Sequence, residues 1–236
     1  MNKERIIIKL SGEALSNGSS QAIDPTKVRE IAQEIKHAYD LGTLEIGIIV
    51  GGGNIWRGKI ASEMGMERSS ADYMGMIATI LNALALQNAI EELGIETRTM
   101  TSLNIPQVAE PYIRRKAISN LEKDRVVIFG GGTGNPYFST DTTSALRAAE
   151  IGAKRILMAK NGTDGVYDKD PQKYNDAIKY EELSHHEVLD KNLGVMDSTA
   201  AALCKDNNIE IIVFDMNVKG NIGRVAAGEK LGTRIY

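Results

Sequence analysis

Residues 45 to 58 read EIGIIVGGGNIWRG, an apolar run that ends in three consecutive glycines. A run rich in isoleucine and valine, without polar alternation, is typical of a strand buried on both faces. Glycines directly after such a run let the backbone come close to a neighbour or a ligand, because they carry no side chain. The stretch therefore predicts a buried parallel strand whose end is cleared for close approach.

Similar runs recur along the chain and alternate with helical patterns. The further predicted strands are RIIIKL (5–10), RVVIF (125–129), RILMA (155–159) and IEIIVF (209–214). The predicted helices run from Asp24-Pro25 to Gly42, from about 72 to 94 and from about 140 to 152. Strands that alternate with helices pair in parallel, with helices on both faces of the sheet. We expect a three-layer αβα sandwich with a mainly parallel central sheet.

The bulk composition narrows the class of protein. The chain has 236 residues and a formal net charge of -3, so it lacks the basic field that would attract nucleic acid. Its single cysteine, Cys204, cannot form an internal disulfide, and no signal-peptide pattern opens the sequence. No apolar stretch approaches the roughly 20 residues of a membrane helix. We expect a cytoplasmic protein without a nucleic-acid or membrane partner.

No repeat, low-complexity segment or proline-rich linker divides the chain. We therefore expect residues 1–236 to form a single domain.

Glycines gather at three predicted strand ends. Ser11-Gly12 follows the first strand, Gly51 to Gly53 follow the second, and Gly130 to Gly134 follow the RVVIF run. In parallel sheets ligands bind at the carboxyl ends of strands, where exposed backbone N–H groups can approach an anion. One such glycine pair could simply make a tight turn, but three together favour a phosphate site.

The sequence contains neither of two common phosphate-binding motifs. The chain contains no G-x-x-x-x-G-K-[ST], and no G-x-G-x-x-G opens its first helix. Phosphoryl transfer requires mainly positioning and neutralisation of charge. Lys9 ends a buried strand and Arg57 follows the triple glycine, so both are candidate cations. An unpaired buried ammonium is costly, which argues against a merely structural Lys9.

Several motifs together resemble those of a known family. They are KLSGEAL (9–15), GGGNIWRG (51–58), ADYMGM (71–76), GTGNPYFSTD (132–141), DGVYDKDP (164–171) and VMDSTA (195–200). In this order they resemble the motifs of the bacterial uridylate kinases, which are members of the amino acid kinase superfamily. ADYMGM and GTGNPYFSTD are the most specific of them.

The resemblance implies an activity, cofactors and partners. Members of this family transfer the γ-phosphoryl group of ATP to UMP in pyrimidine nucleotide biosynthesis, with Mg²⁺ carried on the ATP phosphates and no dedicated protein metal site. The resemblance also implies a homohexamer of three dimers and inhibition by UTP. It further implies that the N-terminal half of the single domain holds mainly the acceptor site and a dimer contact, and the C-terminal half mainly the ATP site. Activation by GTP is in doubt, because NGSSQAID (17–24) stands where family members commonly carry a Gly-Phe-Gly segment.

The resemblance also implies roles for individual residues. The implied catalytic residues are Lys9, Arg57 and Asp141. ATP would contact Lys9, Leu10, Ser11, Gly12, Gly53, Arg57, Asn161, Tyr167 and Asp170. UMP would contact Gly52, Asp72, Thr133, Gly134, Asn135, Pro136, Tyr137, Phe138, Ser139 and Thr140.

Other interpretations remain open at this point. Asp72 and Asp141 could each only cap the helix that follows. The chain could be an amino acid or carbamate kinase of the same superfamily, although a small carboxylate acceptor does not need the segment GTGNPYFST. It could also be a non-catalytic nucleotide sensor, against which Lys9, Arg57 and Asp141 together argue.

The predicted helix from about 72 to 94 is apolar around most of its circumference, which indicates packing on two sides. The residues that indicate this are Met76, Ile77, Ile80, Leu81, Leu84 and Leu86. Because the resemblance implies a hexamer of three dimers, we expect this helix to lie in the dimer contact, and the alternative is a helix buried wholly inside its own subunit.

Overall fold

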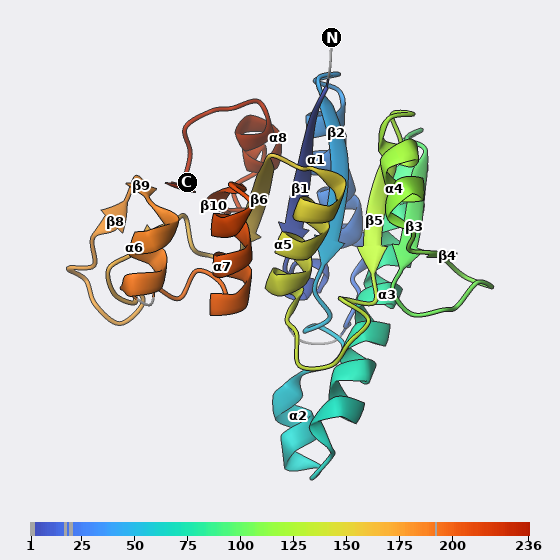
Figure 1. Ribbon diagram of the computed structural model, residues 1–236, viewed down its shortest axis with the longest axis horizontal. Coiled ribbons are helices and arrows are strands. Elements are labelled where there is room, and N and C mark those ends of the chain that lie inside the picture. The colour runs from blue at the N-terminus through green and yellow to red at the C-terminus, as the bar shows by residue number, and fades with distance from the viewer. Residues whose placement is uncertain (1–2, 17, 19–20, 192) are drawn as a thin grey trace.

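A single sheet of nine strands runs through the chain (Figure 1). The computed structural model describes residues 3–16, 18, 21–191 and 193–236. From one edge to the other the strands are β4 (Glu110–Pro111), β3 (Thr97–Thr101), β5 (Val126–Gly130), β2 (Leu44–Val50), β1 (Glu4–Leu10), β6 (Arg155–Lys160), β10 (Glu210–Asp215), β11 (Thr233–Ile235) and β9 (Glu182–Leu183). Neighbouring strands pair in parallel except β10 with β11.

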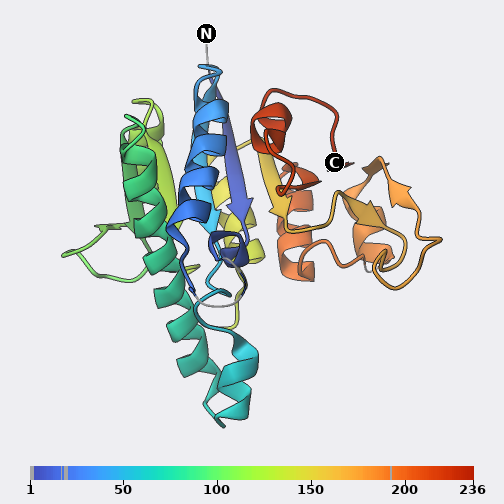
Figure 2. The same ribbon diagram turned by 180° about the vertical axis from the view of Figure 1, so that it is seen from behind.

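Helices cover both faces of this sheet (Figures 1 and 2). One face carries α1 (Pro25–Tyr39), α3 (Arg68–Glu91) and α8 (Asn221–Ala226). The other carries α4 (Arg114–Leu121), α5 (Thr140–Ile151), α6 (His185–Asp190) and α7 (Ser198–Asp206). A short hairpin of β7 (Val166–Tyr167) and β8 (Lys179–Tyr180) lies apart from the sheet. The predicted three-layer αβα architecture with a mainly parallel sheet is confirmed.

Residues of β1 alternate between the two helical layers. Ile6, Ile8 and Leu10 pack in the cluster that includes α1, whereas Ile7 packs in the cluster that includes α5. Successive side chains of a strand point to opposite faces of a sheet. Lys9 therefore lies on the α5 side, at the end where β1 leads into the short 3-10 helix η1 (Gly12–Leu15).

The five predicted strands are present within one residue at each end, but β3 was missed. Its sequence TRTMT lacks the isoleucine and valine of the other strands. Thr97, Thr99 and Thr101 are nevertheless buried, because β3 lies between β4 and β5. Threonine is branched at Cβ and therefore suits a strand. A sheet position filled by threonine does not appear in a search for apolar runs.

The long helix α3 begins earlier than expected. It starts at Arg68 after the N-cap Glu67, and it ends at Glu91, short of the predicted Gly94. Beyond the sheet it packs against α2 (Gly58–Glu63), so the two helices project together at the bottom of Figure 1. The expectation that no stretch reaches membrane length was wrong, since α3 is long and apolar enough to cross a membrane by length and composition alone. Half of its most apolar 18-residue stretch is buried inside the protein, and core helices of soluble proteins are often equally long and apolar.

Candidate active site

A buried ion pair lies at the carboxyl ends of the parallel strands. Lys9 Nζ, from β1, lies 2.6 Å from Asp141 Oδ1, and the two side chains expose 11% and 18% of their surface. Asp141 Oδ1 has no aligned hydrogen-bond donor among the described residues, so the contact is ionic. The N-cap of α5 is Ser139, whose Oγ accepts the N–H groups of Asp141 and Thr142 at 3.0 Å each. The alternative that Asp141 only caps α5 was therefore wrong.

Asp197 ties the start of α5 to the start of α7. Its carboxylate accepts a short hydrogen bond from Ser139 and bonds from Thr142 Oγ1 at 2.9 and 3.0 Å. It also caps α7 through the N–H of Ala200, at 2.9 Å. Burial raises the pKa of Asp197, but these hydrogen bonds outweigh that effect and hold the pKa below its usual range.

No role had been assigned to Asp197 from the sequence, although it lies within the motif VMDSTA (195–200). Aspartate directly before a run of small helix-forming residues is an N-cap pattern, and that signal could have indicated it.

Lys160, at the end of β6, brings a second ammonium group to this centre. Its Nζ donates to the carbonyl of Val195 at 2.6 Å. Burial lowers the pKa of Lys160, the Asp141 carboxylate raises it in part, and the Lys9 ammonium lowers it further. Two ammonium groups, from Lys9 and Lys160, thus lie near the Asp141 carboxylate at the strand ends. The sequence had left Lys160 without a role.

A cavity of about 160 Å³ lies between α3 and the start of α5. Its walls include the only tryptophan, Trp56, together with Thr143. The residues predicted to contact UMP that line this cavity are Gly52, Asp72, Phe138, Ser139 and Thr140, and it is also lined by Gly53, which was predicted to contact ATP. The other predicted UMP residues, Thr133, Gly134, Asn135, Pro136 and Tyr137, precede Phe138 in the same loop.

Asp72 does not cap α3. It lies one turn inside the helix, where its carboxylate pairs with Arg68 and accepts the N–H of Tyr137 at 2.7 Å. The interpretation of Asp72 as a cap was wrong because the helix begins at Arg68 instead of near residue 72. The contact with Tyr137 joins α3 to the loop of residues 133–140, which was predicted to contact UMP.

The glycines at the strand ends serve two different purposes. A Cβ on Gly12 would come within 2.5 Å of the carbonyl oxygen of Gly51, and one on Gly52 within 2.8 Å of that of Gly75. Those residues let segments of the protein press against one another. A Cβ on Gly53 would meet nothing within 4 Å. Of the triple glycine, Gly53 is thus the residue whose bare backbone faces open space.

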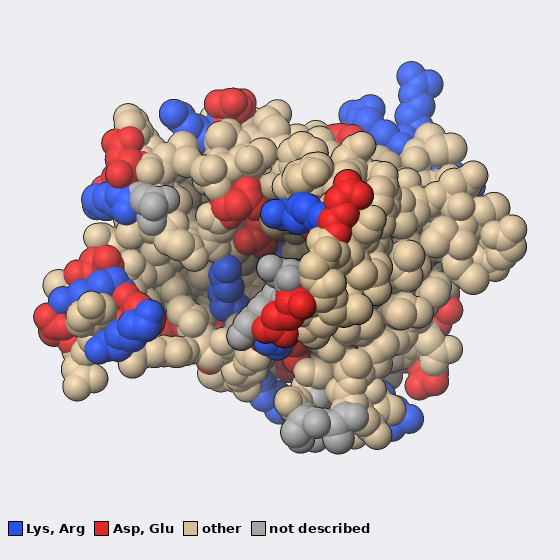
Figure 3. Space-filling view, turned by 90° about the horizontal axis from the view of Figure 1, so that it is seen from below, with Lys and Arg blue, Asp and Glu red and all other residues tan. Residues whose placement is uncertain are grey.

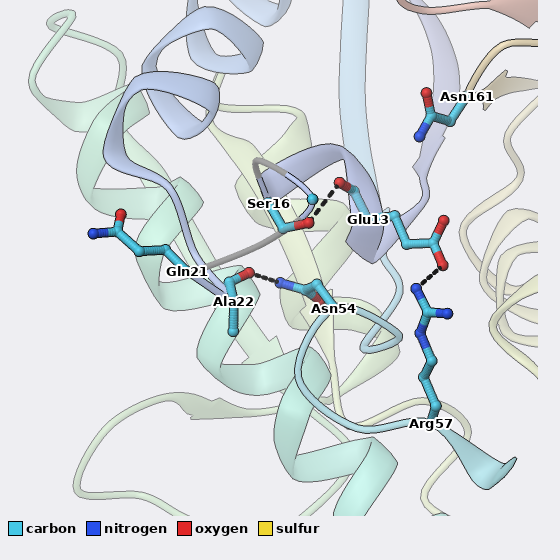
Figure 4. A pocket seen from close by; sticks show the side chains of 8 residues that line it. Glu13, Ser16, Gln21, Ala22, Asn54, Arg57 and Asn161 are labelled. Atoms are coloured by element: carbon cyan, nitrogen blue, oxygen red, sulfur yellow. Dashed lines mark hydrogen bonds and ion pairs between the residues drawn. The ribbon is translucent and has the colours of Figure 1, made fainter. Parts of the chain in front are cut away.

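Arg57 and Asn161 line a second cavity, of about 380 Å³ (Figure 4). Arg57 is exposed and pairs with Glu13 at 2.6 Å, while Asn161 accepts a hydrogen bond from Asn217 at 2.8 Å. Figure 4 shows Arg57, from the segment before α2, and Glu13, from η1, reaching toward one another. The structure therefore does not place Arg57 in direct contact with the Lys9–Asp141 pair.

Tyr167 and Asp170 line a third cavity, of about 470 Å³, which also includes Lys160. The predicted ATP residues thus line three cavities, with Gly53 in the first, Arg57 and Asn161 in the second, and Tyr167 and Asp170 in the third. The side chain of Leu10 is fully buried in the α1 layer, so only its backbone is available to a ligand. Ser11 precedes η1 without capping it through its side chain. Seen from the strand ends, this side of the molecule is hollowed, with charges of both signs nearby (Figure 3).

The model of the amino acid kinase family matches residues 4–215. The chain belongs to that family. It is 57% identical over 232 residues to the uridylate kinase of Limosilactobacillus reuteri, covering 98% of this chain and 96% of that one. The uridylate kinase of Pediococcus pentosaceus is 56% identical with the same coverage.

Solved structures of two UMP kinases have the same fold as this chain. The UMP kinase of Ureaplasma parvum is 42% identical and has a TM-score of 0.95, with 100% of this chain and 99% of that chain covered. The UMP kinase of Bacillus anthracis is 40% identical and has a TM-score of 0.96, with 100% and 96% covered. The resemblance to uridylate kinases stated from the motifs is confirmed.

Proposed function

We propose that this chain is a UMP kinase, which transfers the γ-phosphoryl group of ATP to UMP and yields UDP and ADP. The observation that carries the proposal is the buried pair of Lys9 and Asp141 at the strand ends. Gly53 lines the nearby cavity of about 160 Å³ between α3 and α5, which we call the acceptor cavity. High identity to uridylate kinases over nearly the whole chain supports the same reaction. One domain, residues 1–236, would provide both binding sites.

The charges of the site suit phosphoryl transfer. Negative charge spreads over the oxygens of the transferred group in the transition state, and preorganised cations stabilise it. Lys9 and Lys160 supply two ammonium groups from neighbouring strands. Asp141 would orient Lys9, and in the complex it would also lie near the metal-bound phosphates. Arg57 would move from Glu13 to a phosphate when substrates bind.

Magnesium fits this site as a companion of the nucleotide. Among the residues that the structure describes, no group of three or more His, Cys, Asp or Glu side chains could hold a metal ion. Mg²⁺ is commonly held by substrate phosphates together with one or two carboxylates. Asp141 lies beside Lys9 and would supply such a carboxylate, so Mg²⁺ would be carried by ATP and would add to the neutralisation of phosphate charge.

The two substrates would occupy different cavities. Asp72 would accept hydrogen bonds from the ribose of UMP, and the loop of residues 133–140 would surround the uracil. The ATP phosphates would lie along Lys9, the backbone of residues 10–12 and Gly53. Asn161, Tyr167 and Asp170 would contact the adenosine part, although Asn161 lines a different cavity from the other two.

Assembly and regulation are also proposed from the family. Ile77 and Leu81 expose 49% and 47% of their surface on α3, whereas Met76, Ile80 and Leu86 are buried. The exposed pair would form the dimer contact of a homohexamer in the cytoplasm. Light scattering of the wild type and of Leu81→Glu tests this, since the charge should dissociate the assembly.

UTP would inhibit by occupying the acceptor cavity, and UMP should then relieve the inhibition. Activation by GTP stays open. Residues 17, 19 and 20 of the segment NGSSQAID (17–24), on which that question depends, lie outside the described residues.

The decisive experiment is a coupled assay of ADP release with UMP, CMP, glutamate and carbamate as acceptors. A UMP kinase should turn over UMP far faster than the other three. Turnover of glutamate or carbamate would favour the amino acid or carbamate kinase, and no turnover of any acceptor would favour a nucleotide sensor.

A further inference from the structure

Two groups hold the carboxylate of Asp72, a residue that lines the acceptor cavity. Arg68 Nε lies 3.1 Å from Asp72 Oδ1 and 3.0 Å from Oδ2, and the backbone N–H of Tyr137 donates to Oδ2 at 2.7 Å. The guanidinium carbon of Arg68 also lies 5.6 Å from the centre of the Tyr137 ring. We call these three residues the Arg68 clasp.

The clasp leaves one carboxylate oxygen with more acceptor capacity for a ligand than the other. An ionised carboxylate has acceptor sites on both oxygens but no donor. Oδ2 already accepts two donors, whereas Oδ1 accepts only the shared contact with Arg68 among the described residues. Asp72 lines the cavity, so a hydroxyl group within it would meet an acceptor whose orientation is already set.

The Tyr137 backbone shows that the clasp shapes the loop. Its φ angle is +74°, in the left-handed region that residues other than glycine rarely adopt. Its side chain is exposed, so packing in the protein interior does not hold it there. The N–H bond to Asp72 and the guanidinium of Arg68 are the contacts that hold this residue on α3.

We propose that Arg68 is a positioning residue that fixes the Asp72 carboxylate for the acceptor's sugar and thereby sets the preference for a ribonucleotide over a deoxyribonucleotide. This inference rests on the proposed function, since it concerns the same cavity. Arg68 does not touch the reacting phosphates. It acts through Asp72, whose plane it fixes from one turn earlier in α3.

Two other outcomes are physically reasonable. The Arg68 side chain is 66% exposed, and exposed ion pairs within one helix often contribute nothing measurable. Alternatively, Arg68 could compete with the sugar for Asp72, and its removal would then improve acceptor binding. The three cases predict different signs, so one set of variants separates them.

The test compares UMP with dUMP in the wild type, Arg68→Ala and Arg68→Lys, under saturating ATP and Mg²⁺. In Arg68→Ala the ratio of kcat/KM for UMP to that for dUMP should fall about three- to tenfold, through KM rather than kcat. Arg68→Lys should recover part of the ratio, because it keeps the charge but loses the planar Nε–H donor.

Trp56 allows acceptor binding to be measured without turnover. It is the only tryptophan and it lines the cavity, so its fluorescence should report the binding of UMP in the absence of ATP. The Kd for UMP should rise in Arg68→Ala by the same factor as KM. Ser70→Ala, an exposed change two residues along α3, is the matched control and should leave both values unchanged.

Variants at Tyr137 test the other half of the clasp. Tyr137→Phe keeps the ring over the Arg68 guanidinium, so the ratio of kcat/KM for UMP to that for dUMP should stay at the wild-type value whatever the overall activity. Tyr137→Gly removes the ring but suits the positive φ angle and keeps the N–H, so it should fold and lower the UMP preference about twofold.

An unchanged ratio in Arg68→Ala, equal losses for UMP and dUMP, or tighter UMP binding would each overturn the inference. If the wild type itself did not phosphorylate UMP, the proposed function would fail instead.

Discussion

The molecule contains two pairs of the same chemistry, a cation with an aspartate, in contrasting surroundings. Lys9 and Asp141 come from elements far apart in the sequence and are largely buried, whereas Arg68 and Asp72 lie one turn apart on α3. In the second pair the arginine is 66% exposed and the aspartate 24%. Water screens the exposed pair, but the buried pair interacts through a medium of lower dielectric constant. The buried pair should therefore be strongly coupled to stability and turnover, and the exposed pair only to selectivity.

The largest effect is expected at Lys9. If its ammonium stabilises the charge on the transferred phosphoryl group, Lys9→Ala should lower kcat about 100-fold or more. UMP binding measured by Trp56 fluorescence should change little, because Lys9 is not part of the acceptor cavity's lining. Near-normal turnover would remove Lys9 from the mechanism and reduce the contrast between the two pairs to one of stability.

Matched Asp→Asn changes at the two pairs should differ in stability. Asp141→Asn leaves the Lys9 ammonium buried without its counter-charge, so we expect a loss of about 1.5 to 3 kcal/mol in the free energy of unfolding. Asp72→Asn should cost less than about 0.5 kcal/mol, as is typical of exposed pairs. Urea unfolding of both variants measures the difference. Equal losses would mean that burial does not distinguish the pairs.

At Asp72 the expected effect is on acceptor choice. Loss of a charged partner for a sugar hydroxyl costs on the order of 1 to 3 kcal/mol, so Asp72→Asn should shrink the UMP preference over dUMP by about fivefold or more. Binding of ATP should stay nearly unchanged. Steady-state kcat/KM for both acceptors checks this, and an unaltered preference would place ribose selection elsewhere in the loop of residues 133–140.

The smallest effect is expected on the reactivity of Cys204, which is buried in the same apolar cluster as α5. Burial, with contributions from the Asp141 and Asp197 carboxylates, raises the pKa of its thiol to about 12. Below that pH the native thiol stays protonated and unreactive, so a thiol reagent at pH 8 should label it only after unfolding. Asp141→Asn should accelerate labelling by increasing the unfolded population, and Asp72→Asn should not. Rapid labelling of the native wild type would contradict the buried environment.

The parts of this fold and site that could be predicted from the sequence are those set by local pattern. Apolar runs located β1, β2, β5, β6 and β10, and the motifs identified Lys9, Asp72 and Asp141 as the charged groups to examine. The pattern could not show that Asp141 faces Lys9 or that Asp72 faces Arg68 and Tyr137, because those contacts depend on how the elements pack. It also missed β3, whose buried residues are threonines, and Asp197, whose partners lie in another helix.

The alternation of side chains along β1 constrains how this segment can change in length. Lys9 reaches Asp141 because it points to the α5 side of the sheet, whereas its neighbours Ile8 and Leu10 both point toward α1. A single-residue insertion between Ile7 and Lys9 would turn the Lys9 ammonium into the apolar layer beside α1 and would turn Leu10 to the α5 side, where the phosphates are proposed to bind. Conservative exchanges among the isoleucines should be tolerated, but insertions and deletions in this segment should not, so the length of β1 is under stricter constraint than its composition.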